Sequence, residues 1–362
     1  MFKKHSLFQP LKNCVIGRTY APQFYEFIKD IEVRRRYEQI AYETEEDYQK
    51  LEKLLTSFGV ETIRPTVETS ANFKTRLQSR AWYDQFNPPA QYKGYPTNTC
   101  VVPPPLQPRD WIMMIGDKFI HFLIEPEQYA QYKNIFDYVE SQGNKIYRSN
   151  AAINSEGWIT KIGKRITYGG CGPIGSVGVR EEYNTFISEY GADYENLIYD
   201  DIGWRDSWYR PLKPGLIVSV MGSEKYATDF PNWKVITTDG YDSLVSMYKF
   251  LRLKNSMIDK IWAYGEEADA ARAKLAYEWL DNGWREFASE NVFDCNMLSI
   301  DEKNVVIFNY NKRICNELEK NGITCHLVHY RHRYFWAGGI HCITCDLNRD
   351  GELLDYFDEK GK

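Results

Sequence analysis

The chain of 362 residues lacks both a long apolar run and an excess of positive charge. Its longest apolar stretches, such as GLIVSVM, are strand-sized, whereas a membrane-spanning helix needs roughly 20 apolar residues. The net charge is −5, and the one basic run, residues 34–36, leads into an acidic helical stretch. Nucleic-acid binding requires a basic face. We therefore expect neither a membrane nor a nucleic acid as a partner.

Cysteine is too sparse for a disulfide framework. Eight cysteines are spread along the chain from Cys14 to Cys345, unlike the dense spacing of small secreted domains. The N-terminal segment MFKKHSLFQPLKN has basic residues but no apolar stretch after them, and a secretory signal would have one. These features predict a cytoplasmic protein with reduced thiols.

Aromatic residues, in contrast, are plentiful and make up 15% of the chain. The order of the predicted helices and strands also repeats along the sequence. Helical patterns end at a glycine and are followed by a short strand, and strand pairs turn at Gly116, Gly163 and Asp301. The predicted helices cover about residues 36–57, 128–141, 181–190 and 311–320, with Gly59, Gly143, Gly191 and Gly322 as left-handed caps. Recurrence at roughly 60–80 residues indicates cyclic α/β modules rather than one open sheet.

The segment GGIHCITCD near the C-terminus holds His341, Cys342 and Cys345. Together with Cys325 and His329, the two cysteines have a spacing close to that of structural zinc sites. However, Cys325 and His329 lie in an alternating strand pattern, where residues four apart are roughly 13 Å apart. We therefore do not expect a zinc ion or another metal.

Two other interpretations of this segment compete. A redox pair normally stands at the start of a helix, and no helix pattern follows Cys345. A nucleophilic Cys342 needs a base from elsewhere in the chain, and a free buried cysteine is more often an inert core residue. The residues alone leave the last two alternatives, nucleophile and core, open.

A glycine-rich stretch, GGCGPIG at residues 169–175, matches the GxGxxG pattern of dinucleotide-binding loops. Pro173 lies inside the pattern, and no strand ending in an acidic residue follows at the expected distance. We interpret the stretch as a flexible connection, with a lid over a site as the alternative. No cofactor is expected.

Several segments, taken in order, resemble the glycine amidinotransferase family. They are PLKNCVIGR, PRDWIMMIGDKFI, WRDSWYRPLKPGLIVSV and the region from NMLSIDEKNVVIF to GGIHCITCDLNRDGEL. That family belongs to the guanidino-group-modifying superfamily, whose fold is an α/β propeller of five ββαβ modules. The resemblance therefore implies a single propeller domain over residues 1–362.

The resemblance also implies a reaction. The cysteine at the position of Cys342 attacks the guanidinium carbon of arginine or another guanidino donor, and the amidino group then passes to an amine acceptor. Donor and acceptor would be small molecules, and a homodimer is compatible with the resemblance. The implied catalytic residues are Cys342, Asp206, Asp110 and His341, and the implied substrate-binding residues are Glu156, Trp204, Trp158 and Arg109.

The sequence departs from the family at two of these positions. Trp204 stands where the family has its proton-shuttling histidine, and Trp158 stands where it has a guanidinium-binding aspartate, with Glu156 as the nearest carboxylate. A positioned proton-transfer group contributes typically about 10²–10⁴-fold to the rate. The chain is thus either an enzyme with a replacement base, such as His341, Glu156 or the substrate, or a catalytically reduced binding protein.

Overall fold

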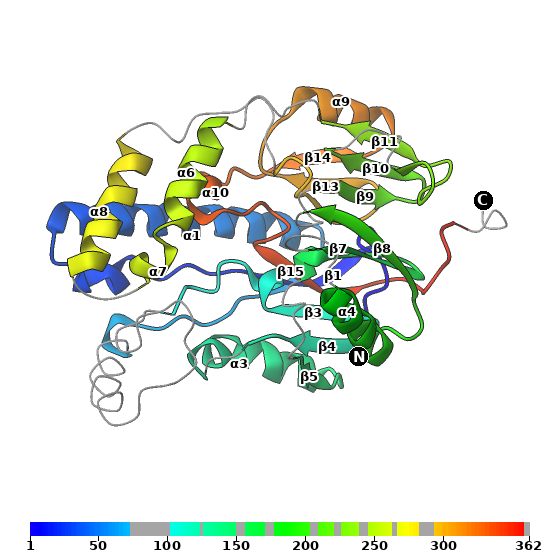
Figure 1. Cartoon of the computed structure of the whole chain (residues 1–362), viewed down its shortest axis with the longest axis horizontal. Coiled ribbons are helices and arrows are strands. Elements are labelled where there is room, and N and C mark those ends of the chain that lie inside the picture. Colours follow the sequence, from blue (N-terminus) through cyan, green and yellow to red (C-terminus); the bar gives the residue numbers. More distant parts are fainter. Residues whose placement is uncertain are drawn as a thin grey trace.

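The computed structural model describes residues 1–72, 102–123, 126–149, 156–170, 177–202, 209–220, 226–238, 245–262, 266–281 and 293–357. The strands in these ranges form five three-stranded sheets (Figure 1). In every sheet the middle strand has an antiparallel neighbour on one side and a parallel neighbour on the other. The parallel strand requires a crossover connection, so each sheet is a ββαβ-type unit.

The first sheet joins the two ends of the chain. Strand β1 (Leu11–Ile16) lies between β2 (Glu61–Ile63), which is parallel to it, and β15 (Thr344–Arg349), which is antiparallel. This pairing places Cys14 opposite Asp346. Because the last strand completes the first sheet, the five units form a closed series. The α/β propeller fold expected from the resemblance is confirmed.

The other four sheets repeat the same order. They comprise β3 (Ile112–Ile115), β4 (Lys118–His121) and β5 (Ile146–Arg148); β6 (Ile159–Ile162), β7 (Arg165–Gly170) and β8 (Glu195–Ile202); β9 (Tyr209–Lys213), β10 (Leu216–Ser219) and β11 (Lys234–Thr237); and β12 (Leu298–Ser299), β13 (Asn304–Ile307) and β14 (Thr324–Leu327). The predicted hairpin turns are confirmed, with Gly116 and Gly163 both at a φ of +58°. That conformation favours glycine because it carries no Cβ penalty there.

Four helices precede the parallel strands: α1 (Ile31–Ser57), α3 (Pro126–Ser141), α4 (Val177–Tyr190) and α9 (Lys312–Lys320). Three of the four expected glycine caps have a positive φ, at Gly59, Gly143 and Gly322. The prediction for Gly191 was wrong, because its φ lies outside the left-handed region and its N–H continues the helical pattern by donating to the carbonyl of Ile187.

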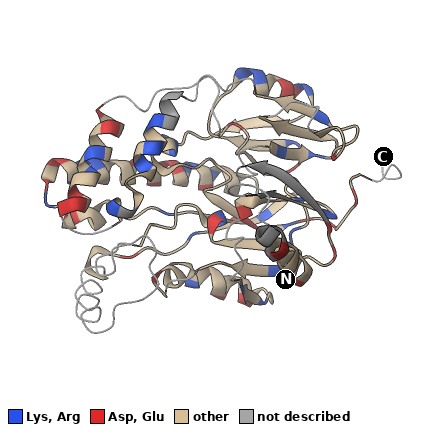
Figure 2. Ribbon diagram, viewed as in Figure 1, with Lys and Arg blue, Asp and Glu red and all other residues tan. Residues whose placement is uncertain are grey.

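A group of helices between β11 and β12 was not predicted. It consists of α6 (Val245–Asn255), α7 (Ile258–Ile261) and α8 (Glu266–Leu280), and α8 packs against α1 (Figure 1). Much of the buried face of α8 is alanine, which gives a weak apolar pattern in the sequence. Figure 2 shows Lys and Arg interspersed with Asp and Glu along these outer helices. No helix in the described ranges is long and apolar enough to cross a membrane.

Candidate active site

Cys342 lies in a tight turn that leads into β15. The short helix α10 (Arg333–Trp336) ends at Ala337, which has a φ of +54°, and the chain then passes through two glycines into the turn. The N–H of Thr344 donates to the carbonyl of His341 over 3.2 Å, which closes the turn. Cys342 therefore lies before β15 and not on it, because turn hydrogen bonds occupy the backbone up to Thr344. The Cys342 side chain is half-buried.

The side-chain amide of Asn296 holds this turn. Its Nδ2 donates to Sγ of Cys342 over 3.0 Å, and its Oδ1 accepts the backbone N–H groups of His341 and Cys342 over 2.9 and 3.2 Å. Asn296 is fully buried. A Cβ on Gly339 would lie 2.4 Å from Oδ1 of Asn296, so only glycine fits beside the amide. Sequence reasoning did not single out Asn296, although the NMLSIDEK segment that starts with it was part of the resemblance.

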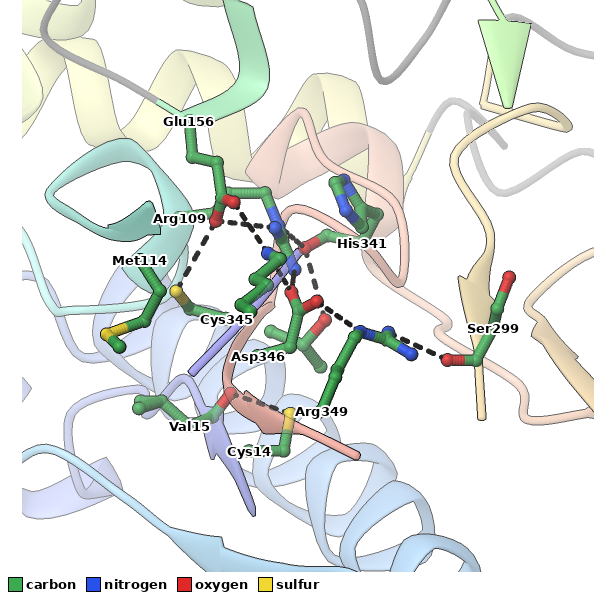
Figure 3. A network of polar contacts seen from close by, with 12 residues as sticks. Cys14, Val15, Arg109, Met114, Glu156, Ser299, His341, Cys345, Asp346 and Arg349 are labelled. Carbon is green, nitrogen blue, oxygen red and sulfur yellow. Dashed lines mark hydrogen bonds and ion pairs between the residues drawn. The ribbon is translucent and has the colours of Figure 1, made fainter. Parts of the chain in front are cut away.

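Behind the turn lies a buried polar network (Figure 3). Glu156, in the short helix η3 (Glu156–Trp158), accepts from Nζ of Lys4 over 2.6 Å and from Nη1 of Arg109 over 2.7 Å, and Lys161 also donates to it. All four side chains are inaccessible to solvent. Burial acts to raise the pKa of Glu156, but the charges of Lys161, Lys4 and Arg109 outweigh it and lower that pKa. Glu156 is thus an ionised structural partner of three cations.

Asp346 on β15 is the second carboxylate of the network. It forms ion pairs with Lys4 over 2.7 Å, with Arg109 over 2.6 Å and with Arg349 over 2.6 Å, again without exposure. Its pKa is well below the ordinary value, because the surrounding cations outweigh the opposing effect of burial. The neighbouring thiol of Cys345 is buried near Glu156, and burial followed by that negative charge raises its pKa. Cys345 is therefore a neutral core thiol.

His341, next to the nucleophile candidate, is held between two arginines. Nη1 of Arg210 lies 2.7 Å from its Nε2, and Nε of Arg109 donates to its carbonyl over 2.8 Å. The side chain is buried, and burial, then Arg109 and Arg210, lower its pKa well below 6.5. The imidazole is therefore neutral and engaged with Arg210.

The remaining predicted residues are Asp110, Trp158, Trp204 and Asp206. Asp110 ends the short helix η2 (Pro108–Asp110) and is half-buried. The preceding Gln107 donates to the carbonyls of Trp336 and Ala337 over 2.7 and 3.3 Å, which ties η2 to the approach to Cys342. Trp158 is buried in an apolar cluster with residues of β3, β4, β6 and β7. Trp204 and Asp206 lie outside the described residues.

Two buried phenols from different elements contact each other. Tyr48 on α1 and Tyr330, which follows β14, lie 3.3 Å apart through their hydroxyl groups, and both are buried. Burial raises the pKa of each, and the nearby thiol of Cys342 contributes in the same direction. Both side chains are therefore neutral hydroxyl groups. The structure thus brings Arg109, Glu156 and His341 together in a buried network and leaves Cys342 at its accessible end.

Comparisons with known proteins find sequence similarity over part of the chain and structural similarity over most of it. No family model matches the chain. Over 79 residues the chain is 35% identical to mitochondrial glycine amidinotransferase of Xenopus tropicalis, and over 80 residues it is 35% identical to that of Gallus gallus. Each match covers 22% of this chain and only 17% of the relative.

Solved structures match over nearly the whole chain. The inosamine-phosphate amidinotransferase of Streptomyces griseus has a TM-score of 0.63 at 16% identity and covers 99% of both chains. An amidinotransferase of the saxitoxin pathway from Microseira wollei has a TM-score of 0.63 at 13% identity, covering 98% of this chain and 99% of that one. A dimethylarginine dimethylaminohydrolase has a TM-score of 0.52 at 10% identity, with 92% and 99% covered. The resemblance is confirmed at the level of the fold: the chain has the fold of these amidinotransferases, and about a fifth of it is similar in sequence to glycine amidinotransferase.

Proposed function

We propose that the chain is an amidinotransferase-like enzyme in which Cys342 carries an amidino group from a guanidino donor to an amine acceptor. The observation that supports this most directly is the 3.0 Å contact from Nδ2 of Asn296 to Sγ of Cys342. An N–H donor directed at sulfur stabilises the thiolate, which is the nucleophilic form of cysteine. A second observation is the partial exposure of Cys342, since Cys14 and Cys345 are fully buried.

The proposed reaction has two balanced steps. Sγ of Cys342 bonds to the guanidinium carbon, the bond from that carbon to the donor's substituted nitrogen breaks, and the proton first carried by the thiol ends on the leaving amine. The acceptor amine then bonds to the same carbon and sulfur leaves. The acceptor's surplus proton ends on sulfur or in solvent, so the enzyme returns to its starting state.

The structure supports different roles for the other predicted residues. Asp110 is half-buried beside the turn, and we assign it to the guanidinium, because a carboxylate pairs with that planar cation through two hydrogen bonds. Glu156 and Arg109 have no exposed surface and are paired with each other. We therefore propose that they position the turn instead of binding substrate.

We also assign a positioning role to His341, because its Nε2 already accepts a hydrogen bond from Arg210. Trp158 is assigned to an apolar wall, since it is 8% exposed within an apolar cluster. The roles of Asp206 as a catalytic residue and of Trp204 as a substrate-binding residue stay predictions from the sequence.

Incubation of the protein with arginine and other guanidino compounds, with and without a panel of amines, tests the proposal. Mass spectrometry should detect one amidino group on the Cys342 peptide, and a guanidinylated amine when an acceptor is present. The Cys342→Ser variant should lose both products. The matched control is Cys325→Ser, because Cys325 is another half-exposed thiol, on β14. Absence of an adduct with every donor contradicts the proposal.

The alternative is a binding protein of the same fold that does no group transfer. It is favoured by one observation: neither His341 nor Glu156 is available as a base, because the first is bonded to Arg210 and the second to three cations. Calorimetry distinguishes the proposed enzyme from a binding protein. Binding of a guanidino compound that is reversible and equal in wild type and Cys342→Ala, without an adduct, supports the alternative.

A further inference from the structure

Two cysteines of the last module lie in contact with each other. Cys315 is on α9 and Cys325 is on β14, and the helix packs directly on that strand (Figure 1). Both cysteines are free, and their side chains are hydrogen-bonded to each other. Cys315 belongs to an apolar cluster of buried residues, against which Cys325 packs. The fold thus brings together two thiols from separate elements.

Three other thiols of the chain contact groups of a different kind. Sγ of Cys14 and Sγ of Cys345 donate to backbone carbonyls inside the protein, and Sγ of Cys342 accepts from the side-chain amide of Asn296. None of these partners can form a covalent bond to sulfur under mild oxidation. The two thiols on α9 and β14 can form one, because each is the other's partner.

A metal site is the competing interpretation of two adjacent thiols. A structural zinc ion bound by thiolates has four protein ligands. In the ranges that the structure describes, no group of three or more His, Cys, Asp or Glu side chains could hold a metal ion. His326, which follows Cys325 on β14, has its Nε2 in contact with Oδ1 of Asn304 over 2.9 Å. The surroundings of the pair therefore favour redox chemistry over metal binding.

The hydrogen bond between the two thiols favours a thiolate at Cys315. The bond from Cys325 lowers the pKa of Cys315, although burial opposes this effect. The same bond, followed by burial, raises the pKa of Cys325, so that the shared proton stays there. The charge of Glu319 on α9 acts to raise both pKa values. A thiolate in contact with a second sulfur is the arrangement from which a disulfide forms.

The pair is also accessible from one side. Cys315 is only 1% exposed, whereas Cys325 is partly exposed on its strand. A small oxidant therefore reaches the pair from solvent through Cys325, while a bulky thiol reagent is hindered at Cys315. Accessible thiols close to a second cysteine are the ones that oxidise reversibly.

We propose that Cys315 and Cys325 form a reversible disulfide when a small peroxide reaches them, so that oxidation links α9 to β14 while the protein stays folded. The inference is independent of the proposed function, because Cys342 takes no part in the reaction. It assigns to the last module a modification site that is separate from the candidate nucleophile.

The proposed oxidation has two balanced steps with hydrogen peroxide. One sulfur bonds to a peroxide oxygen, the O–O bond breaks, and a sulfenic acid and one water form. The second sulfur then bonds to the first, the S–O bond breaks, and the hydroxyl group leaves as water with the proton of the second thiol. The two thiols lose two electrons in total, and the peroxide is reduced to two waters. A dithiol reductant restores both thiols.

The test is peptide mapping of the full chain under nonreducing conditions, after exposure to hydrogen peroxide and quenching with N-ethylmaleimide. Trypsin cleaves between the two cysteines at Lys320, so the disulfide joins residues 314–320 to residues 321–331. We expect this linked pair of peptides in wild type, and its loss after dithiothreitol. Because the fold holds the sulfurs together, the link should form at least about tenfold faster in the native protein than in urea.

Two variants make the result specific. Cys325→Ser should abolish the linked peptides, and Cys342→Ser should leave the rate of linkage unchanged. Loss of the link in Cys342→Ser overturns the inference, because the oxidant would then act through Cys342.

Three results with wild type alone also overturn it. They are the absence of the linked peptides, a sulfinic acid at Cys325 with Cys315 still reduced, and a link that forms no faster in the native protein than in urea. The test therefore decides even if a variant fails to fold. Its outcome does not depend on amidino transfer, which is measured in a separate assay.

Discussion

Nη1 of Arg210 donates to Nε2 of His341 over 2.7 Å inside the protein. Arginine has donors only and stays protonated, so Nε2 of this histidine must be the acceptor and the ring proton must be on Nδ1. The residue that precedes Cys342 in the sequence is therefore directed at a cation and not at the sulfur. The arrangement of His341 and Cys342 therefore differs from a simple Cys-His pair, in which the imidazole would contact the sulfur.

The first prediction concerns the protonation state of His341. Because burial, Arg109 and Arg210 lower its pKa below 6.5, the ring should stay neutral from about pH 8 down to below pH 6, with the proton on Nδ1. Long-range ¹H–¹⁵N NMR spectra of the histidine-labelled protein measure this directly, and a His341→Gln variant assigns the signal. An imidazolium signal at pH 6 contradicts the prediction.

The second prediction concerns Asn296. In Asn296→Asp the Oδ1 acceptor for the turn is retained, but the donor to sulfur is replaced by an anionic oxygen. A hydrogen bond to a charged group stabilises that group by enough free energy to change a rate about 10- to 100-fold. Alkylation of Cys342 at pH 7 should therefore slow by that factor in the variant. The matched control is Asn348→Asp on β15, where the amide contacts Asn13 instead. Equal alkylation rates in the two variants would show that Asn296 does not stabilise the thiolate.

The third prediction concerns Gly339. Its Cβ in Gly339→Ala would lie 2.4 Å from Oδ1 and 2.7 Å from Cβ of Asn296. Overpacking of this kind costs about 1–3 kcal/mol, and displacement of the amide should also slow alkylation of Cys342. Urea unfolding and the alkylation assay measure the two effects. In Gly191→Ala the closest neighbours lie at 3.4 Å, so both quantities should stay near wild type. If the stability and the alkylation rate are both unchanged in Gly339→Ala, the side-chain amide of Asn296 is free to shift.

Much of the fold was predictable from local signals. Gly59, Gly143 and Gly322 stop helices because their φ is positive, and the three hairpins turn where the sequence indicates. The helices α6 to α8 were missed, because an alanine-rich buried face such as that of α8 differs little in hydropathy from an exposed one. Closure of the propeller came only from the family resemblance, since β1 and β15 are too distant in sequence for any local pattern to pair them.

The site was predicted less well than the fold. The resemblance pointed to Cys342 and to the segments around it, but residue types alone do not show burial. Glu156 and Arg109 were assigned to substrate because a carboxylate and a guanidinium suit it, and the structure instead places them in contact with each other. Lys4 could not be linked to this site from the sequence, since it lies more than three hundred residues from its partner Asp346.

The last prediction concerns the buried charges. Removal of one partner of a buried ion pair leaves an uncompensated charge, which costs about 3–5 kcal/mol. In Glu156→Gln three cations, Lys4, Arg109 and Lys161, lose an anionic partner at once. The free energy of unfolding in urea at pH 7 should therefore fall by at least that amount. Glu140→Gln, an exposed substitution at the end of α3, should change it by no more than about 0.5 kcal/mol.

Two further measurements test whether Glu156 stabilises the protein through its charge. They are the pH dependence of the free energy of unfolding and the stability of a double variant. The pKa of Glu156 is lowered in the folded state, so its stabilisation is present above the unfolded pKa of about 4.3 and is lost as the pH falls towards the folded value. The Glu156→Gln variant should accordingly lose less stability than wild type between pH 5 and pH 3. Adding Lys161→Met removes one of the uncompensated cations, so the double variant should be more stable than the sum of the single effects predicts. Strict additivity would mean that Glu156 acts through packing and not through its charge.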